Sequence, residues 1–373
     1  MNDASSAAAL RAPVRLAWLR NGWPSLLVAA LVVTAAVYSF APRPKPEFPP
    51  TQVYPDRLLV NGLAQQGSRI VAVGEQGQIL VADDPRGPWH SARLAASHGL
   101  TFTRTLFVAE GVVLAVGHDG VIARSTDRGE NWQEVALGTE GSDPLLGIAG
   151  PYDGRVFAFG AFGLFMVSDD LGQTWQRRDL VIDEGVKAAA AAAADPDADP
   201  FAGFEAESVG GAEHLNDMTQ AADGSLILVG ERGLILRSTD KGETWTRIGK
   251  DVYAGSFFGV LALPSRTLLA FGMRGNAFRS TDLGKTWTQC RIPTATSLFS
   301  GAALGGAQVL LAGAGNAILR SDDDGVSFRA VSRSGRTTYA ALLPISADEW
   351  LTGGDTGLSV RRPEAITANG DAS

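Results

Sequence analysis

An eight-residue pattern, here called the octet, recurs along this chain and constrains its fold more than any other feature. Ser238 to Trp245 reads Ser-Thr-Asp-Lys-Gly-Glu-Thr-Trp, and Ser280 to Trp287 repeats it almost letter for letter. Further copies, two close to this pattern, one looser and one degenerate, are Ser125 to Trp132, Ser168 to Trp175, Ser321 to Phe328 and Ala82 to Trp89.

The composition of the octet is that of a tight hairpin. An aspartate carboxylate accepts hydrogen bonds from turn amides two or three residues further on, and glycine adopts the positive φ that such turns need. The tryptophan packs its large apolar face against a neighbour. Because nothing in the octet is placed as a nucleophile or an acid, we predict a structural role. The residues expected to carry it are Asp84, Asp127, Asp170, Asp240, Asp282 and Asp323, with Trp132, Trp175, Trp245 and Trp287.

A second repeat precedes each octet: a strand-like run ends in Gly, two residues follow, and a second Gly starts another strand. The glycine pairs are Gly74/Gly77, Gly117/Gly120, Gly160/Gly163, Gly230/Gly233, Gly272/Gly275 and Gly354/Gly357. In the sixth unit Gly313 is followed by Asn316, and Asn is a usual substitute where φ is positive. The first glycines are separated by 43, 43, 70, 42, 41 and 41 residues.

A period of about 42 residues with several strands per unit is typical of a β-propeller that has one four-stranded sheet per blade. The runs before the glycines are strand-like, and glycine recurs too often for helical hairpins. We therefore predict an all-β, seven-bladed propeller over residues 57–364, followed by a frayed tail at 365–373. The seventh unit has three candidate strands and no octet, so Thr51 to Tyr54 is the expected donor of the strand that closes the ring.

The spacing of 70 contains about 28 extra residues, at Asp183 to Glu213, which include seven alanines and an Asp/Pro-rich stretch. One interpretation is a mobile, partly helical surface loop. The other is a partner-binding flap with Phe201 and Phe204 as its apolar contacts.

The amino-terminal region predicts a membrane anchor. Residues 1–20 carry arginines, and residues 21–41 are uncharged and apolar over about one bilayer span. Basic residues before this span favour a cytoplasmic amino terminus and an exported domain. We predict a single-pass protein of the bacterial inner membrane, with a Pro-rich spacer at 42–56 and the propeller in the periplasm. A cleaved signal peptide is the alternative: Ser39 to Ala41 resembles a cleavage site, although Pro42 is unfavourable after it.

Composition excludes several kinds of function. The formal net charge is -8 and no basic stripe is present, which argues against a nucleic-acid partner. Cys290 is the only cysteine, so neither a disulfide framework nor a thiolate metal cluster is expected. The four histidines show no metal-ligand spacing. We expect no metal and no cofactor.

In a propeller, the residue pairs enclosed by the glycines should line one rim, while the octets lie on the opposite face. These pairs differ from unit to unit within a constant frame, which is how a scaffold displays a specific surface. The candidate binding residues are Glu75, Gln76, His118, Asp119, Phe162, Glu231, Arg232, Met273, Arg274 and Asp355.

An arginine directly precedes the octet serine in several units. The residues are Arg124, Arg237, Arg279 and Arg320, with Arg361 equivalent in the last unit. One interpretation is that these arginines pair with octet carboxylates. The other is a belt of guanidinium groups that receives an acidic protein partner.

The octet resembles the Asp-box, or bacterial neuraminidase repeat, of sialidases and several non-catalytic propellers. The whole unit, Val-Gly-x-x-Gly-x-Ile-x-Arg-Ser-Thr-Asp-x-Gly-x-Thr-Trp, resembles the photosystem II stability/assembly factor family over residues 57–362. This resemblance implies an exported seven-bladed propeller that is not an enzyme and helps to assemble membrane protein complexes. In non-photosynthetic bacteria it implies service to other inner-membrane systems, exporters included. The acidic, Ala-rich insert and the anchor are departures from the family.

Two functions follow. The first is a non-enzymatic, membrane-tethered propeller that binds an inner-membrane protein complex, a transporter being one class, and assists its assembly or stability. The alternative is a sialidase-like Asp-box glycoside hydrolase acting on extracytoplasmic glycans. That reaction needs two carboxylates facing each other across the channel, and Asp217 and Glu231 are the acids whose substitution would test it.

Overall fold

The structure is a computed structural model that describes residues 17–41, 53–95, 99–136, 142–182 and 213–364. The chain divides into two units, Met1–Gln52 and Val53–Ser373. Most of the expected insert, including Phe201 and Phe204, lies outside the described residues, as do residues 1–16 of the expected cytoplasmic tail, 42–52 of the spacer and the tail 365–373.

The described part of the first unit is one helix, α1 (Ala17–Phe40). Its stretch Trp23–Phe40 is long and apolar enough to cross a bilayer, and its side chains are exposed. Leu, Val and Ala dominate this stretch, so in water the helix would leave a continuous apolar surface unburied. Length and composition therefore agree with either a membrane span or a signal sequence.

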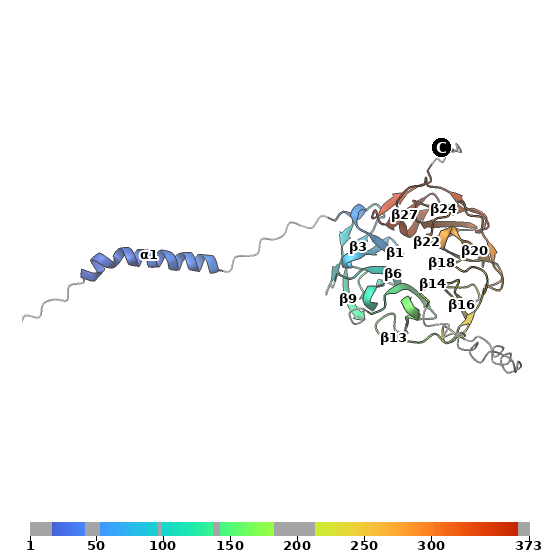
Figure 1. The fold of residues 1–373 in the computed structure, drawn as a ribbon, viewed down its shortest axis with the longest axis horizontal. Coiled ribbons are helices and arrows are strands. Elements are labelled where there is room, and N and C mark those ends of the chain that lie inside the picture. Colours follow the sequence, from blue (N-terminus) through green and yellow to red (C-terminus); the bar gives the residue numbers. More distant parts are fainter. Residues whose placement is uncertain (1–16, 42–52, 96–98, 137–141, 183–212, 365–373) are drawn as a thin grey trace, which may run out of the picture. The chain divides into compact units, whose positions relative to one another are not determined.

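The second unit is a ring of seven sheets, so the predicted seven-bladed propeller is confirmed. In Figure 1 the strands β1, β6, β14, β18 and β22 lie nearest the centre. The first three sheets contain β1 (Val60–Gln66), β2 (Arg69–Gly74), β3 (Ile79–Ala82) and β4 (His90–Ser91); β6 (Phe102–Ala109), β7 (Val112–Gly117), β8 (Ile122–Ser125) and β9 (Asn131–Ala136), joined by β5 (Arg93–Leu94); and β10 (Leu145–Tyr152), β11 (Arg155–Gly160), β12 (Phe165–Ser168) and β13 (Gln176–Arg177).

The remaining sheets follow the same order. They contain β14 (Leu215–Gln220), β15 (Leu226–Gly230), β16 (Ile235–Ser238) and β17 (Thr246–Arg247); β18 (Phe257–Ala262), β19 (Leu268–Gly272), β20 (Ala277–Ser280) and β21 (Thr288–Gln289); β22 (Leu298–Gly305), β23 (Gln308–Gly313), β24 (Ile318–Ser321) and β25 (Arg329–Ala330); and β26 (Tyr339–Ser346), β27 (Glu349–Gly354) and β28 (Ser359–Arg361).

The core lies between neighbouring sheets. The second strand of each sheet is sandwiched on both faces, and β2 is buried along its whole length, which is why these strands are continuous apolar runs. Between the first two sheets, Val71 and Val81 pack against Phe102, Val113 and Trp132. Each pair of sheets thus shares an apolar layer, and the ring is held together by seven such layers rather than by one central core.

Backbone pairing reinforces these layers at the periphery. After its outermost strand, the first sheet sends β5 to pair in parallel with β9 of the second sheet. Parallel bridges of the same kind join Ile182 to Trp245 and Arg291 to Ser327. Each segment pairs with backbone groups at the outer edge of the next sheet, so main-chain hydrogen bonds join neighbouring sheets along part of the ring's circumference.

The seventh sheet has three strands, and the ring closes against the segment that precedes β1. Val53 and Leu58 pack into an apolar cluster with Leu351 and Leu358, and Leu358 N donates to Pro55 O at 2.7 Å. The expected fourth strand at Thr51–Tyr54 is not formed at Val53 and Tyr54; Thr51 and Gln52 lie outside the described residues.

Candidate functional site

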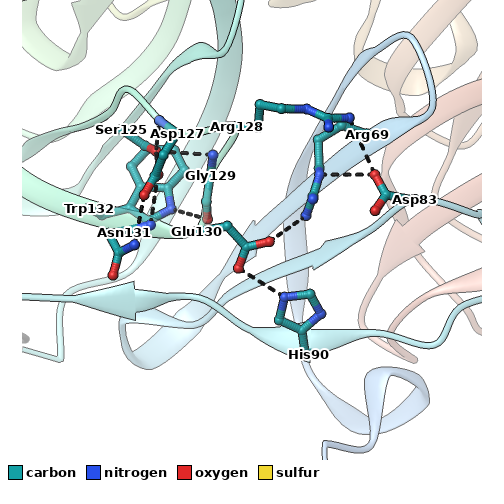
Figure 2. Close-up of polar contacts among 10 residues, drawn as sticks. All are labelled: Arg69, Asp83, His90, Ser125, Asp127, Arg128, Gly129, Glu130, Asn131 and Trp132. Atoms are coloured by element: carbon teal, nitrogen blue, oxygen red, sulfur yellow. Dashed lines mark hydrogen bonds and ion pairs between the residues drawn. The ribbon is translucent and has the colours of Figure 1, made fainter.

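The octets form the predicted hairpins between the third and fourth strands of five sheets. Figure 2 shows the copy at Ser125–Trp132. Asp127 Oδ1 accepts from Asn131 N at 2.9 Å, and Oδ2 accepts from Asn131 Nδ2 at 2.7 Å. Ser125 Oγ donates to Asp127 and accepts from Gly129 N, where φ is +87°. Trp132 Nε1 closes the turn by donating to Gly129 O at 2.8 Å.

One detail of the predicted turn is wrong. The principal amide partner of the aspartate lies four residues further on, at Asn131, Thr244, Thr286 and Ser327, and the two residues at the tip both adopt positive φ. Asp170 also takes the amide of Gln173, three residues on. In the degenerate copy Asp84 accepts from Arg86 N at 2.7 Å, and Trp89 is half-buried.

These bonds fix the ionisation of the octet aspartates. The hydroxyl and amide of Thr286, with the Ser280 hydroxyl, lower the pKa of Asp282 to about 2. In Asp170 and Asp240 partial desolvation acts in the opposite direction, but equivalent bonds still bring the pKa to about 2. Such carboxylates are ionised and saturated with donors, so they hold the hairpin rather than transfer protons.

The glycine turns form the rim on the face opposite the octets. The amide that follows each first glycine donates to the carbonyl just before the innermost strand of the same sheet; for Glu75 and Leu59 this distance is 3.3 Å, and for His118 and Thr101 it is 2.9 Å. In several sheets the residue at the second-glycine position donates to the next sheet, as Gly77 N does to Leu100 O at 2.7 Å. Asn316, with φ of +59°, occupies the second-glycine position of the sixth sheet, as predicted.

The predicted rim residues stand at the tips of these turns. Exposed members are Gln76, His118, Phe162, Arg232, Arg274 and Asp355; half-buried members are Glu75, Asp119, Glu231 and Met273. Phe162 is the most unusual, because its side chain is 55% exposed and its backbone has positive φ.

Two sheets contribute a connected cluster to this rim. The Phe162 ring lies edge-on to His214, with 5.0 Å between centroids. His214 Nδ1 lies 3.4 Å from Glu231 Oε1, and its backbone amide donates to Glu231 Oε2 at 3.3 Å. His214 was not among the predicted rim residues. Its position just before the innermost strand was the available signal, since each such residue is bonded to a rim turn.

A cavity of about 260 Å³ opens where the innermost strands meet at the centre of the ring. Its lining combines a cation, polar side chains and aromatic rings: Asn61, Thr103, Arg104, His118, Leu146, Asn216, Phe258 and Phe299. Of these, only His118 is a predicted rim residue, so that residue joins the rim to the cavity.

Most of the cavity lining was missed, although the sequence carries a signal for it. In each sheet the first glycine pairs in register with one residue of the innermost strand, such as Gly117 with Phe102 and Gly272 with Phe257. The next residue, Thr103 or Phe258 here, lines the cavity. Several of these side chains bond across sheets, as Asn61 Nδ2 does to Phe102 O at 2.9 Å and Asn216 Nδ2 to Phe257 O at 2.7 Å.

Arg104 and Asp217 occupy equivalent positions just after a register shift in β6 and β14. Arg104 Nη1 donates to Asn61 O at 3.0 Å and to Thr103 O at 3.2 Å. Asp217 accepts from the amides of Met218 at 3.0 Å and Val260 at 2.9 Å. Desolvation raises the pKa of Asp217 to about 6 against these bonds and the positive charge of Arg104.

The arginines before the octets are largely paired, which favours their structural interpretation. Arg279 Nη2 lies 3.0 Å from Asp324 Oδ2, in the octet of the next sheet, and Arg320 lies 2.9 Å from Asp322 in its own octet. Arg237 instead pairs with Asp223, outside any octet, at 2.6 Å. A belt of free guanidinium groups is therefore not formed by these three residues.

The known protein-family models and the curated proteins include no sequence match to this chain. Several solved structures share its fold. YCF48 bound to D1 peptide is 15% identical with a TM-score of 0.61, covering 86% of this chain and 99% of that one. YCF48 from Cyanidioschyzon merolae is 17% identical, with a TM-score of 0.59 and coverage of 84% and 98%.

An enzyme has the same fold. Virginiamycin B lyase from Staphylococcus aureus is 14% identical with a TM-score of 0.62, covering 81% of this chain and 94% of that one. At these identities the likeness shows the propeller fold alone. The same architecture carries a peptide in one neighbour and catalysis in another, so function has to be argued from the site.

Proposed function

We propose that this protein is a membrane-tethered, exported propeller that binds an inner-membrane protein complex through its glycine-turn rim and assists the assembly or stability of that complex. The observation that carries the proposal is the rim itself. Its backbone is repeated from sheet to sheet by the same hydrogen bonds, while its exposed tips differ: Phe162, Arg232 and Arg274 stand at equivalent places in three turns. Constant backbone with varied exposed tips is how a rigid scaffold presents a specific surface.

The amino-terminal helix supports the membrane part of the proposal. An apolar helix of sufficient length precedes the propeller, and basic residues precede the helix in the sequence. This arrangement favours export of the propeller to the periplasmic side of a bacterial inner membrane. There the rim would meet the extracytoplasmic parts of integral membrane proteins.

The fold neighbours agree with a binding role and do not decide it. YCF48, a propeller of similar fold, has been observed with a D1 peptide. The octets resemble the Asp-box, a repeat that also occurs in non-catalytic propellers. Lyases share the fold as well, so the proposal rests on the rim and on the helix, with the neighbours in a secondary place.

The glycoside-hydrolase alternative finds less support in the cavity. That reaction uses two carboxyl groups on opposite sides of the scissile bond. The described lining of the cavity contains no carboxylate. Both oxygens of Asp217 accept backbone amides, and Glu231 pairs with His214 on the rim. The two acids named from the sequence therefore serve two different local structures.

Site-directed photocrosslinking in intact membranes tests the proposal. A photoreactive amino acid is placed at Phe162, Arg232 or Arg274 on the rim, and at exposed Lys285, within an octet on the opposite face, as the matched control. We expect the rim positions to form adducts with an integral membrane protein and Lys285 to form none. Equal adducts from both faces, or none from the rim, would contradict the proposal.

A further inference from the structure

Arg104 lacks the kind of anionic partner that the well-shielded Arg69, Arg155 and Arg320 have. Arg69, Arg155 and Arg320 each lie within 2.9 Å of a carboxylate oxygen. Arg104 forms no ion pair with any residue in the described part of the chain; its two bonds, both through Nη1, go to main-chain carbonyls. Its Nε and Nη2 find no acceptor among those residues, and Arg104 contributes to the lining of the cavity.

The surroundings of Arg104 strengthen its attraction for an anion. Desolvation lowers the pKa of Arg104, and the charge of Asp217 acts in the opposite direction. The group nevertheless remains a cation, because a guanidinium stays protonated in proteins. A partly desolvated cation with unused donors gains more from an incoming anion than one that is fully hydrated. Asp217 is held by two backbone amides and forms no ion pair with Arg104.

The backbone around Arg104 is built to admit this side chain. The positions equivalent to it in the neighbouring first and third sheets are Gly62 and Gly147. A Cβ at Gly62 would lie 2.9 Å from the Cα of Arg104, so only glycine allows the two innermost strands to approach here. The arginine is therefore held on a closely packed frame, which limits the entropy lost when a ligand binds.

The opposite part of the cavity is apolar. The rings of Phe258 and Phe299 lie 5.2 Å apart between centroids at an interplanar angle of 38°. Two half-buried phenylalanines from adjacent sheets form a surface suited to a flat or aliphatic group. The lining therefore pairs one guanidinium with an apolar platform, the combination that recognises an amphipathic anion.

We propose that the central cavity binds a small organic monocarboxylate. Its carboxylate lies against Nε and Nη2 of Arg104 as a two-pronged acceptor, and its apolar body lies on Phe258 and Phe299. The amide and hydroxyl groups of Asn61, Asn216 and Thr103 are engaged with neighbouring carbonyls, so they shape the cavity. The volume of about 260 Å³ is just below the roughly 300–1,000 Å³ common for ligand pockets, which limits the occupant to a small molecule.

Isothermal titration of the full-length protein in detergent with 3-phenylpropionate, benzoate and hexanoate tests this site. The matched neutral probe is 3-phenylpropanamide, which has the same shape without the charge. We expect saturable binding of at least one carboxylate, with a dissociation constant of about 1 mM or tighter, and at least about tenfold weaker binding of the amide. No binding by any of the three acids, or equal binding of acid and amide, would overturn the proposal.

Substitutions then locate the site. Arg104→Gln should weaken carboxylate binding about 10- to 100-fold, because hydrogen bonds to a charged group are lost. Phe258→Leu should weaken 3-phenylpropionate more than hexanoate. Should Arg104→Gln fail to fold, Phe258→Leu and the comparison of acid with amide still show whether the carboxylate binds in the central cavity. Arg177→Gln, on the outermost strand β13, is the charge-matched control and should bind as the parent does. Unchanged affinity in a folded Arg104→Gln protein would place the ligand elsewhere and end the proposal.

Discussion

Arg69 Nη1 donates to Glu130 Oε1 at 2.9 Å, and this ion pair joins the first sheet to the second octet (Figure 2). The Arg69 side chain is only 9% exposed and also contacts Asp83, while His90 Nε2 lies 3.0 Å from the other oxygen of Glu130. These four side chains, from two sheets, form one ion-pair network, and Arg69 is its least exposed member.

Glu130→Gln should therefore destabilise the propeller measurably. The change leaves the shielded Arg69 guanidinium with Asp83 as its only acid, which we expect to cost about 1–2 kcal/mol, because Glu130 is itself partly hydrated. Thermal melting of the full-length protein in detergent measures the effect. Arg329→Gln breaks a pair whose side chains are 59% and 46% exposed, so it should change stability by about 0.5 kcal/mol or less. Equal losses in both variants would show that burial of Arg69 has no energetic role.

Acid should destabilise the hairpins through their aspartates. The folded pKa of Asp282 is about 2, below the ordinary aspartate value, because Thr286 and Ser280 donate to its charged form. A group with a depressed folded pKa contributes stability above its unfolded pKa and loses that contribution as the pH falls toward 2. Asp282→Asn should thus lower stability at pH 7 and flatten its fall between about pH 4 and pH 2. Thermal melting of both proteins at several pH values in this range measures the effect. If stability fell with pH as steeply in Asp282→Asn as in the parent, Asp282 would not be a source of the acid sensitivity.

Gly117→Ala should be among the most damaging single changes. A Cβ there would lie 2.2 Å from Thr101 O, the carbonyl that the rim turn uses. We expect a loss of at least about 3 kcal/mol, or failure to fold. Gly154→Ala is the control, since its φ is +85° but no atom lies within 4 Å of the added Cβ; about 1 kcal/mol is expected. Similar melting temperatures for the two variants would contradict the steric argument.

Ring closure depends on the short segment before β1. A chain that begins at Val53 should melt as the full-length protein does, because the apolar contacts and the Pro55 carbonyl bond are retained. A chain that begins at Leu59 loses Val53, Leu58 and the acceptor for Leu358, and should melt at a much lower temperature. Circular dichroism of both truncated chains measures this, and coincident curves would show that the seventh sheet closes the ring unaided.

The fold could be predicted because two of its structural positions require particular residue types, which recur in the sequence. Each first glycine packs against a carbonyl that excludes any side chain, and each octet needs its aspartate and glycine at fixed spacing. The first glycine recurs in all seven sheets, so counting these glycines counts the blades, whereas the octet is degenerate in the first sheet and absent from the seventh. Asn316 followed the same rule, since its positive φ is one that asparagine tolerates.

The central cavity could not be predicted with equal ease. Its lining side chains follow the register partners of the glycines, but no residue type is required there, so Thr103, Phe258 and Asn61 leave no recurring letter. Arg104 becomes conspicuous only when its position is seen to lie after a register shift. The contact between Phe162 and His214 likewise joins residues from two sheets, which no local pattern records.

The repeated closure of the rim turns has a consequence for how such a protein changes over time. Because the hydrogen bonds that these turns share join main-chain atoms, the side chains of Phe162, Arg232 and Arg274 can be exchanged without removing those bonds. A few substitutions at these turn positions could therefore change what the rim binds during evolution, and grafting residues onto the turns could do the same in an engineered protein.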